Sequence, residues 1–131
     1  MKPQNILSID YGTHKVGFAR TLECIALPIG ISYSREALRD AREYMDRYDI
    51  TQVIYGYPKN LSGHPELTVI KKLDTFIKAL QKTHPQALYS PVDERYSTQL
   101  ARFSLDVAGI DSLEVDDVSA VILLENYLSS H

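Results

Sequence analysis

The order in which the hydrophobic periodicity changes along the chain constrains its fold more than any other feature. Three short runs near the start, Ile6–Tyr11, Val16–Arg20 and Pro28–Tyr33, have the composition of strands joined by tight turns. Apolar residues then recur at steps of three and four from Ala37 to Tyr48, with Ser34 as the expected N-cap. The first part of the chain therefore predicts an antiparallel meander followed by a helix.

Strand-like and helix-like segments alternate in the rest of the chain. In chain order they are a strand over Gln52–Tyr57, a long helix opened by Pro65 and ending near His84, a strand over Ala87–Val92, a shorter helix capped by Ser97 and Thr98, and a last helix around the apolar run Val118–Leu124, capped by Asp116 or Asp117. This order predicts an α/β fold with one five-stranded mixed sheet and helices on both faces. The alternation of strands with helices favours a fourth and a fifth strand parallel to the first, with a right-handed crossover each time.

Length and composition fit one globular domain over residues 1–131. Hydrophobic residues make up 44% of the 131 residues and charged residues 24%, which is ordinary for a globular protein. The single Cys24 has no internal disulfide partner and the chain opens on no signal-like segment, so we expect a cytoplasmic location. The apolar runs are much shorter than the roughly 20 residues of a membrane helix, so no membrane partner is expected.

The formal net charge of −3 argues mildly against a nucleic-acid partner, because phosphate contacts depend on Lys and Arg. Clustered carboxylates awaiting metal would themselves lower the total, and 14 basic residues remain to form a local patch. The charge therefore predicts weak, salt-sensitive binding of nucleic acid.

Three acidic positions follow apolar segments and are candidates for one metal site. Asp10 ends the first strand, Glu94 follows the fifth, and Asp116 or Asp117 starts the last helix. The carboxyl ends of parallel strands form the ligand crevice of an open sheet, and one intervening strand would separate Asp10 from Glu94 by about 10 Å at the backbone. Oxygen donors at that spacing suit one or two Mg²⁺ or Mn²⁺ ions and metal-assisted phosphodiester hydrolysis.

Each acid also has a simpler explanation. Asp10 precedes Gly12 and is a good turn-former, Asp116 and Asp117 are good helix caps, and Glu94 next to Arg95 makes a surface ion pair. Taken singly, each simpler explanation is the better one; the order of the acids and their occurrence together with the motifs described next favour a shared site.

Four ordered motifs carry a family resemblance over nearly the whole chain. They are Ile-Asp10-Tyr-Gly-Thr, Tyr-Gly-Tyr-Pro58-Lys-Asn-Leu-Ser-Gly63, Asp93-Glu-Arg-Tyr-Ser-Thr98, and Asp116 followed by Ser-Ala-Val-Ile-Leu-Leu from Ser119. Together they resemble the YqgF/RuvX family. The resemblance implies a ribonuclease H-like three-layer sandwich and a nuclease, with Asp10, Glu94 and Asp116 as the catalytic, metal-binding acids.

Six further residues are candidates for substrate binding. Lys15 and Arg95 would offset phosphate charge, Lys59 and Asn60 follow the fourth strand at the mouth of the crevice, and Ser97 and Thr98 would contact phosphate as a secondary role. Hydration of the loop explains Lys59 and Asn60 equally well.

The expected function is that of a metal-dependent nuclease, with two ions of Mg²⁺ or Mn²⁺, in 5′ processing of pre-16S ribosomal RNA. The alternatives are a Holliday junction resolvase on branched DNA, a non-catalytic nucleic-acid-binding domain, and a single-lobe nucleotide-binding domain. A resolvase must cut two strands symmetrically and would be a dimer, whereas nothing in the sequence marks a dimer face. We therefore expect a monomer or a weak homodimer.

Overall fold

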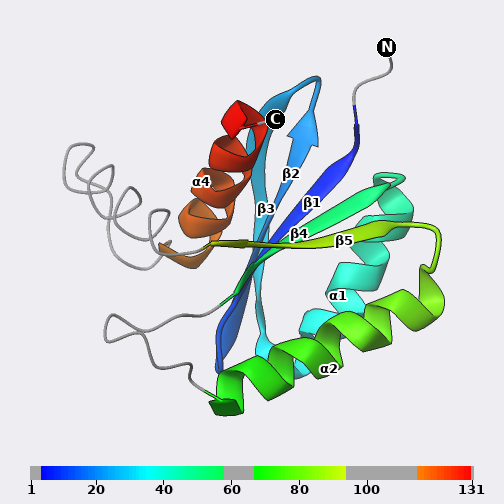
Figure 1. Cartoon of the computed structure of the whole chain (residues 1–131), viewed down its shortest axis with the longest axis vertical. Helices are drawn as coiled ribbons and strands as arrows, with labels where there is room; N and C mark the ends of the chain where they lie inside the picture. The colour runs from blue at the N-terminus through cyan, green and yellow to red at the C-terminus, as the bar shows by residue number, and fades with distance from the viewer. Residues whose placement is uncertain (1–3, 58–66, 94–114, 131) are drawn as a thin grey trace.

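The structure is a computed structural model that describes residues 4–57, 67–93 and 115–130. The strands are β1 (Ile6–Tyr11), β2 (Lys15–Leu22), β3 (Ile25–Tyr33), β4 (Gln52–Tyr57) and β5 (Leu88–Asp93). The helices are α1 (Ser34–Arg47), α2 (Leu67–Thr83) and α4 (Val115–Ser130), as Figure 1 shows. The helix predicted after Ser97 and Thr98 lies outside the described residues.

The five strands form one mixed sheet in the order β3-β2-β1-β4-β5. β2 pairs antiparallel with both β1 and β3, whereas β4 pairs parallel with both β1 and β5. The predicted meander and the predicted parallel half of the sheet are both confirmed. The carboxyl ends of β1, β4 and β5 therefore lie at the same edge.

The β2–β3 hairpin is longer than the sequence predicts. Its turn consists of Glu23 and Cys24, both with positive φ, of 49° and 71°. Two positive φ values are typical of the tight hairpin turn that usually carries Asn-Gly, so Glu-Cys gives no such signal in the sequence. β3 consequently begins at Ile25 and not near Pro28, which lies beside a register shift in this edge strand.

The helix starts differ from the prediction at two places. The N-cap of α1 is Tyr33 and makes no side-chain capping bond, so the prediction of Ser34 as N-cap is wrong. Asp116 and Asp117 lie inside α4 and not before it, so neither caps that helix. Pro65, predicted to open α2, lies outside the described residues.

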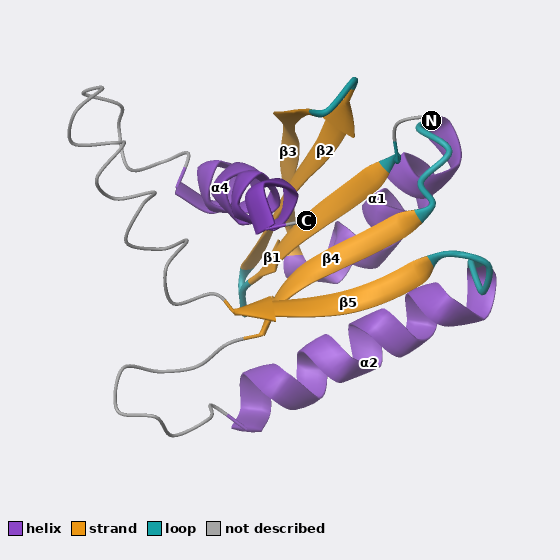
Figure 2. Ribbon diagram, turned by 45° about the horizontal axis from the view of Figure 1, so that its top comes forward, coloured by secondary structure: helices purple, strands orange, loops and turns teal. Residues whose placement is uncertain are grey.

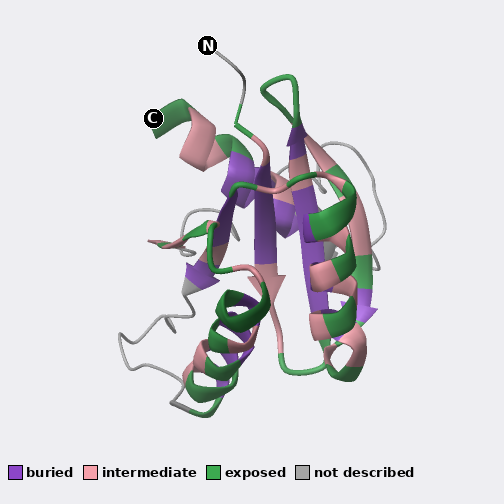
Figure 3. Cartoon of the chain, turned by 90° about the vertical axis from the view of Figure 1, so that its right-hand side faces the viewer, coloured by how far each residue is buried: buried purple, intermediate pink, exposed green. Residues whose placement is uncertain are grey.

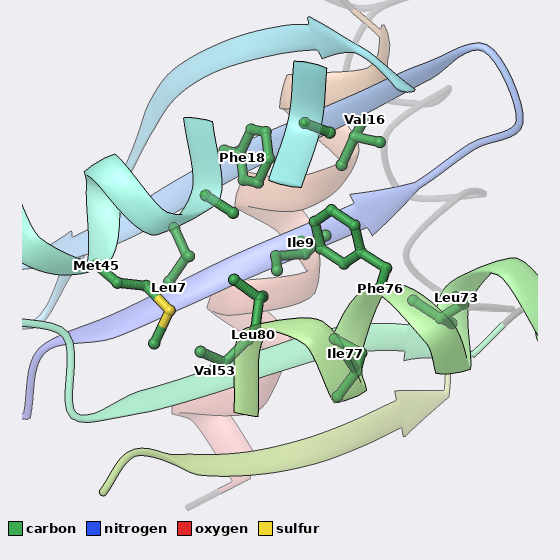
Figure 4. Close-up of a cluster of buried hydrophobic side chains, with 12 residues drawn as sticks. Leu7, Ile9, Val16, Phe18, Met45, Val53, Leu73, Phe76, Ile77 and Leu80 are labelled. Carbon is green, nitrogen blue, oxygen red and sulfur yellow. The ribbon is translucent and has the colours of Figure 1, made fainter. Parts of the chain in front are cut away.

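The helices cover both faces of the sheet, as predicted. Figure 2 shows α4 on one face and α1 and α2 on the other. The larger core lies under α1 and α2, and its side chains come from the sheet (Leu7, Ile9, Val16, Phe18, Val53), from α1 (Ala37, Ala41, Met45) and from α2 (Leu73, Phe76, Ile77, Leu80), most of which Figure 4 labels. Figure 3 shows that the outward faces of these two helices are exposed.

A smaller core lies between the sheet and α4. Ile6, Ala19 and Ile54 of the sheet pack there against Ala120, Leu123 and Leu124 of α4. Residues at even positions of β1 therefore face α4, and residues at odd positions face α1 and α2.

Candidate metal centre and family

Asp10 lies near the carboxyl end of β1, and its side chain is half-buried. Ile6 packs against α4 and the Ser8 hydroxyl bonds to that helix, so alternation along the strand places Asp10 on the α4 side of the sheet. The sequence thus puts a carboxylate at the crevice edge of the sheet, on the face that only α4 covers among the described helices.

Two hydrogen bonds fix the direction of α4 across the sheet. The Ser8 Oγ donates to the Ala120 carbonyl over 2.8 Å, and the Gln52 Nε2 donates to the Tyr127 hydroxyl over 2.6 Å. Gln52 begins β4 and pairs with Ile6 at the start of β1. The later part of α4 therefore lies at the amino ends of β1 and β4, and the start of α4 lies toward their carboxyl ends.

This direction brings the backbone of Asp116 to the level of Asp10. Asp116 precedes Ala120 by one helical turn, about 6 Å along the axis. Asp10 follows Ser8 by two residues, about 6.6 Å along the strand, in the same direction. From the Ser8–Ala120 bond, both acids are thus displaced by similar distances toward the same edge of the sheet.

The third predicted acid, Glu94, lies just outside the described residues. The last described residues of β5 are Val92, which packs on the α4 side of the sheet, and Asp93, which pairs with Tyr57 of β4. The structure therefore describes β5 up to the residue before Glu94 and shows that β5 ends at the same edge as β1.

The turn after Asp10 is held by close backbone contacts. A Cβ at Gly12 would lie 2.6 Å from the Lys15 carbonyl oxygen, so only glycine fits without a shift of the backbone. The Ser34 amide donates to the His14 carbonyl over 2.8 Å, which ties the turn to the start of α1. Lys15, a predicted phosphate contact, begins β2 beside this turn with an exposed side chain.

The remaining predicted substrate contacts lie outside the described residues: Lys59, Asn60, Arg95, Ser97 and Thr98. Among residues 4–57, 67–93 and 115–130, no group of three His, Cys, Asp or Glu side chains is placed to hold a metal ion. Asp10 contributes the described carboxylate at this edge, and the backbone of Asp116 lies at the same level. Carboxylate oxygens are the donors that hard divalent cations prefer, so the chemistry of Asp10 suits a ligand of such an ion.

Sequence reasoning missed the residues that position α4. Ser8 is fully buried within an apolar strand, and Gln52 is also buried. Buried polar groups are normally hydrogen-bonded, so a serine between Leu7 and Ile9 was the available signal. The sequence could not show that its partner is a carbonyl 112 residues away.

The order of the strands and the helices on both faces of the sheet define a fold of the ribonuclease H-like class. Thermus thermophilus RuvC, solved in complex with a Holliday junction substrate, superimposes with a TM-score of 0.63 at 10% identity, over 98% of this chain and 95% of RuvC. The yeast mitochondrial Holliday junction resolvase Ydc2 gives a TM-score of 0.59 at 8% identity, over 95% of this chain and 78% of Ydc2. These similarities show the fold.

The chain belongs to the RuvX family. The family model described as "RuvX: Holliday junction resolvase" matches residues 4–130. Two relatives named "Putative pre-16S rRNA nuclease" are each 30% identical: one from Amoebophilus asiaticus, with 96% of this chain and 94% of the relative covered, and one from Bacteroides thetaiotaomicron, with 95% and 96% covered. With its family, the chain is classed as a nuclease, a hydrolase of phosphodiester bonds in nucleic acid.

Nucleases of the RuvC-like fold generally use divalent metal ions, in agreement with the oxygen donors at this edge. No helix in the described ranges combines the length and the apolar character needed to cross a membrane.

Proposed function

We propose that Asp10, Glu94 and Asp116 together hold two divalent cations, Mg²⁺ or Mn²⁺, within a single nuclease domain that spans residues 1–131. The observation that carries the proposal is the meeting of β1 and α4 at one edge, with Asp10 and the backbone of Asp116 at the same level. Glu94 follows β5, whose end lies at this edge one strand beyond β4. In this proposal the sheet supplies two ligands and the helix supplies the third.

Divalent cations, when bound, supply activation of water and neutralisation of charge at the scissile phosphate. The chain's own contribution would be to hold the backbone positions of these acids. Asp10 is held by the β1 ladder and by the tight turn at Gly12, and the backbone of Asp116 is held by the seating of α4 on Ser8. Lys15 and Arg95 would offset phosphate charge, and Lys59, Asn60, Ser97 and Thr98 would bind the flanking sugar-phosphate.

The proposed substrate is the precursor of 16S ribosomal RNA in the cytoplasm, where the chain would act in 5′ processing as a monomer or weak homodimer. The names of the relatives from A. asiaticus and B. thetaiotaomicron support this choice. Resolution of Holliday junctions is the second candidate, because the family description and the fold shared with RuvC both favour it. A resolvase cuts two strands symmetrically and would require a dimer.

Cleavage of matched substrates tests the proposal. A pre-16S RNA fragment and a four-way DNA junction would be incubated with the wild type, Asp10→Asn, Glu94→Ala and the control Glu125→Gln. Glu125 is an exposed acid on α4, beyond Ala120 from the proposed site. We expect Mn²⁺-dependent cleavage of the RNA by the wild type and the control, and none by the other two variants.

The melting temperature gives a second readout of metal binding. Mn²⁺ should raise the melting temperature of the wild type, because it binds only the folded state, and should raise that of Asp10→Asn less. Equal shifts in the two proteins would contradict the role of Asp10 as a ligand. Cleavage of the junction but not of the RNA would replace the first candidate with the second.

A further inference from the structure

A cleft lies between α1 and α2, on the opposite side of the sheet from Asp10. We call it the α1–α2 cleft; its volume is about 450 Å³. The residues that line it are Tyr11 of β1, Ser34, Arg35 and Leu38 of α1, and Lys71, Lys72, Thr75, Phe76 and Ala79 of α2. A volume of this size is within the range of small-molecule sites and accommodates one nucleotide unit.

α1 and α2 pack on the same core, and two polar contacts join them beyond the cleft. The His84 Nε2 lies 2.8 Å from the Asp46 Oδ1, and an Arg42 guanidinium nitrogen donates to the Ala79 carbonyl over 3.3 Å. The cleft lies between the earlier parts of the two helices, beside Arg35 of α1 and Lys71 of α2.

The rim of the cleft is cationic and is not neutralised within the described chain. Arg35, Lys71 and Lys72 are all exposed, and none of them forms an ion pair with a described residue. Three positive charges thus line one cleft in a chain of net charge −3. Arg42 does not line the cleft; its guanidinium donates to the Ala79 carbonyl, and its buried Nε has no hydrogen-bond partner among the described residues.

The floor of the cleft is apolar and aromatic. The rings of Tyr11 and Phe76 pack against each other with centroids 5.4 Å apart, and Leu38 and Ala79 complete the floor. Burial raises the pKa of the Tyr11 phenol above its ordinary value near 10. A cationic rim over an aromatic floor is the combination that binds single-stranded nucleic acid, through phosphate contacts and base packing.

The cleft begins directly beside the candidate metal centre along β1. Tyr11 follows Asp10 in the strand, and the two side chains lie on opposite faces at the same edge of the sheet. A strand of nucleic acid that passes around this edge from the side of Asp10 would therefore meet the cleft next.

We propose that the α1–α2 cleft binds a single-stranded flank of the nucleic-acid substrate, with a base over Tyr11 and Phe76 and the adjoining phosphates on Arg35, Lys71 and Lys72. This assignment rests on the proposed nuclease function and extends it to the side of the sheet away from the acids. A duplex would offer phosphates to the rim but no free base to the floor, so the cleft favours single strands over duplexes.

Binding without cleavage tests the assignment. The affinity of the full chain for a labelled 12-nucleotide single-stranded RNA would be measured by fluorescence anisotropy in EDTA, at several salt concentrations. The test variant is Lys71→Ala with Lys72→Ala, and the matched control is Lys78→Ala with Lys82→Ala. The control pair removes the same charge from exposed positions of the same helix that do not line the cleft.

We expect the test variant to bind about tenfold more weakly and its salt slope to fall by about 1.4, the value for two lost phosphate contacts on a single strand. The control should stay within about twofold of the wild type, and Lys71→Arg with Lys72→Arg should restore most of the affinity. The same RNA as a blunt duplex should bind more weakly than the single strand.

Three results would overturn the assignment: unchanged affinity and salt slope in the test variant, an equal loss in the control, or a duplex that binds as tightly as the single strand. Cleavage by the wild type in Mn²⁺ is measured separately. If the wild type cleaves while the test variant binds normally, only the cleft assignment fails. If Lys71 and Lys72 are needed for binding but nothing is cleaved, the cleft assignment stands and the nuclease proposal fails.

Discussion

Replacement of Gly12 by alanine tests whether the turn after Asp10 depends on close backbone packing. The new Cβ would lie 2.6 Å from the Lys15 carbonyl oxygen, about 0.8 Å inside the 3.4 Å at which ordinary contact begins. The obstacle is backbone that belongs to the β1–β2 connection, so it cannot turn aside as a flexible side chain can. Overpacking of this kind costs about 1–3 kcal/mol.

The cost translates into a measurable change of melting temperature. An unfolding entropy of about 2.1 cal/mol/K per residue gives about 0.28 kcal/mol/K for 131 residues, so Gly12→Ala should melt about 4–11 °C below the wild type. Thr13→Ala is the matched control, because Thr13 is exposed in the same turn and should change the melting temperature by less than about 2 °C.

Calorimetry of the metal-free proteins measures the melting temperatures of both variants. A titration with Mn²⁺ then measures how far the metal raises each melting temperature, which reports on the position of Asp10. The displaced turn should weaken the Mn²⁺-induced rise in melting temperature for Gly12→Ala but not for Thr13→Ala. A Gly12→Ala protein that melts with the wild type would refute the argument from the Lys15 carbonyl.

Two further predictions concern buried hydroxyl groups. Ser8→Ala removes the hydrogen bond to the Ala120 carbonyl and should cost about 1 kcal/mol in urea unfolding, whereas Ser129→Ala, which loses only a bond within its own exposed helix end, should be close to neutral. Equal effects would show that the Ser8 bond does not hold α4. Burial raises the pKa of Tyr89 to about 12, from an unfolded value near 10. The protonated phenol therefore contributes to the free energy of unfolding below pH 10, and this contribution is lost as the pH rises toward 12. The stability difference between the wild type and Tyr89→Phe should therefore shrink between pH 8 and pH 11 in urea unfolding; a constant difference would contradict a buried, protonated hydroxyl that donates to the His84 carbonyl.

Most of the fold follows from local patterns in the sequence. The run Ile6–Tyr11 and the run Gln52–Tyr57 are strands with the predicted bounds, because β-branched and aromatic residues there are bounded by clear turn signals. Their parallel pairing follows from the helix that lies between them in the sequence. The turn at Glu23 and Cys24 could not be predicted, since these residues adopt positive φ without the usual Asn or Gly.

The sequence predicts a set of site residues, which stays a prediction, and it does not predict how they are placed in space. Asp10 stands out because a half-buried acid follows an apolar strand, and β5 ends where the parallel topology requires. The position of the Asp116 backbone relative to Asp10 depends on the Ser8–Ala120 hydrogen bond, which joins residues 112 positions apart. Local rules for strands and helices carry no information about such a contact, so they predicted Asp116 or Asp117 as a cap.

The place of α4 in the chain has a consequence during synthesis on the ribosome. All five strands precede α4 in sequence, so the sheet and its first two helices emerge and can fold before this helix leaves the exit tunnel. Until then no described helix covers the side of the sheet that bears Asp10, and the proposed third ligand is absent. A nascent chain of this nuclease would therefore stay inactive beside the ribosomal RNA around it, and the late arrival of α4 would act as a built-in delay.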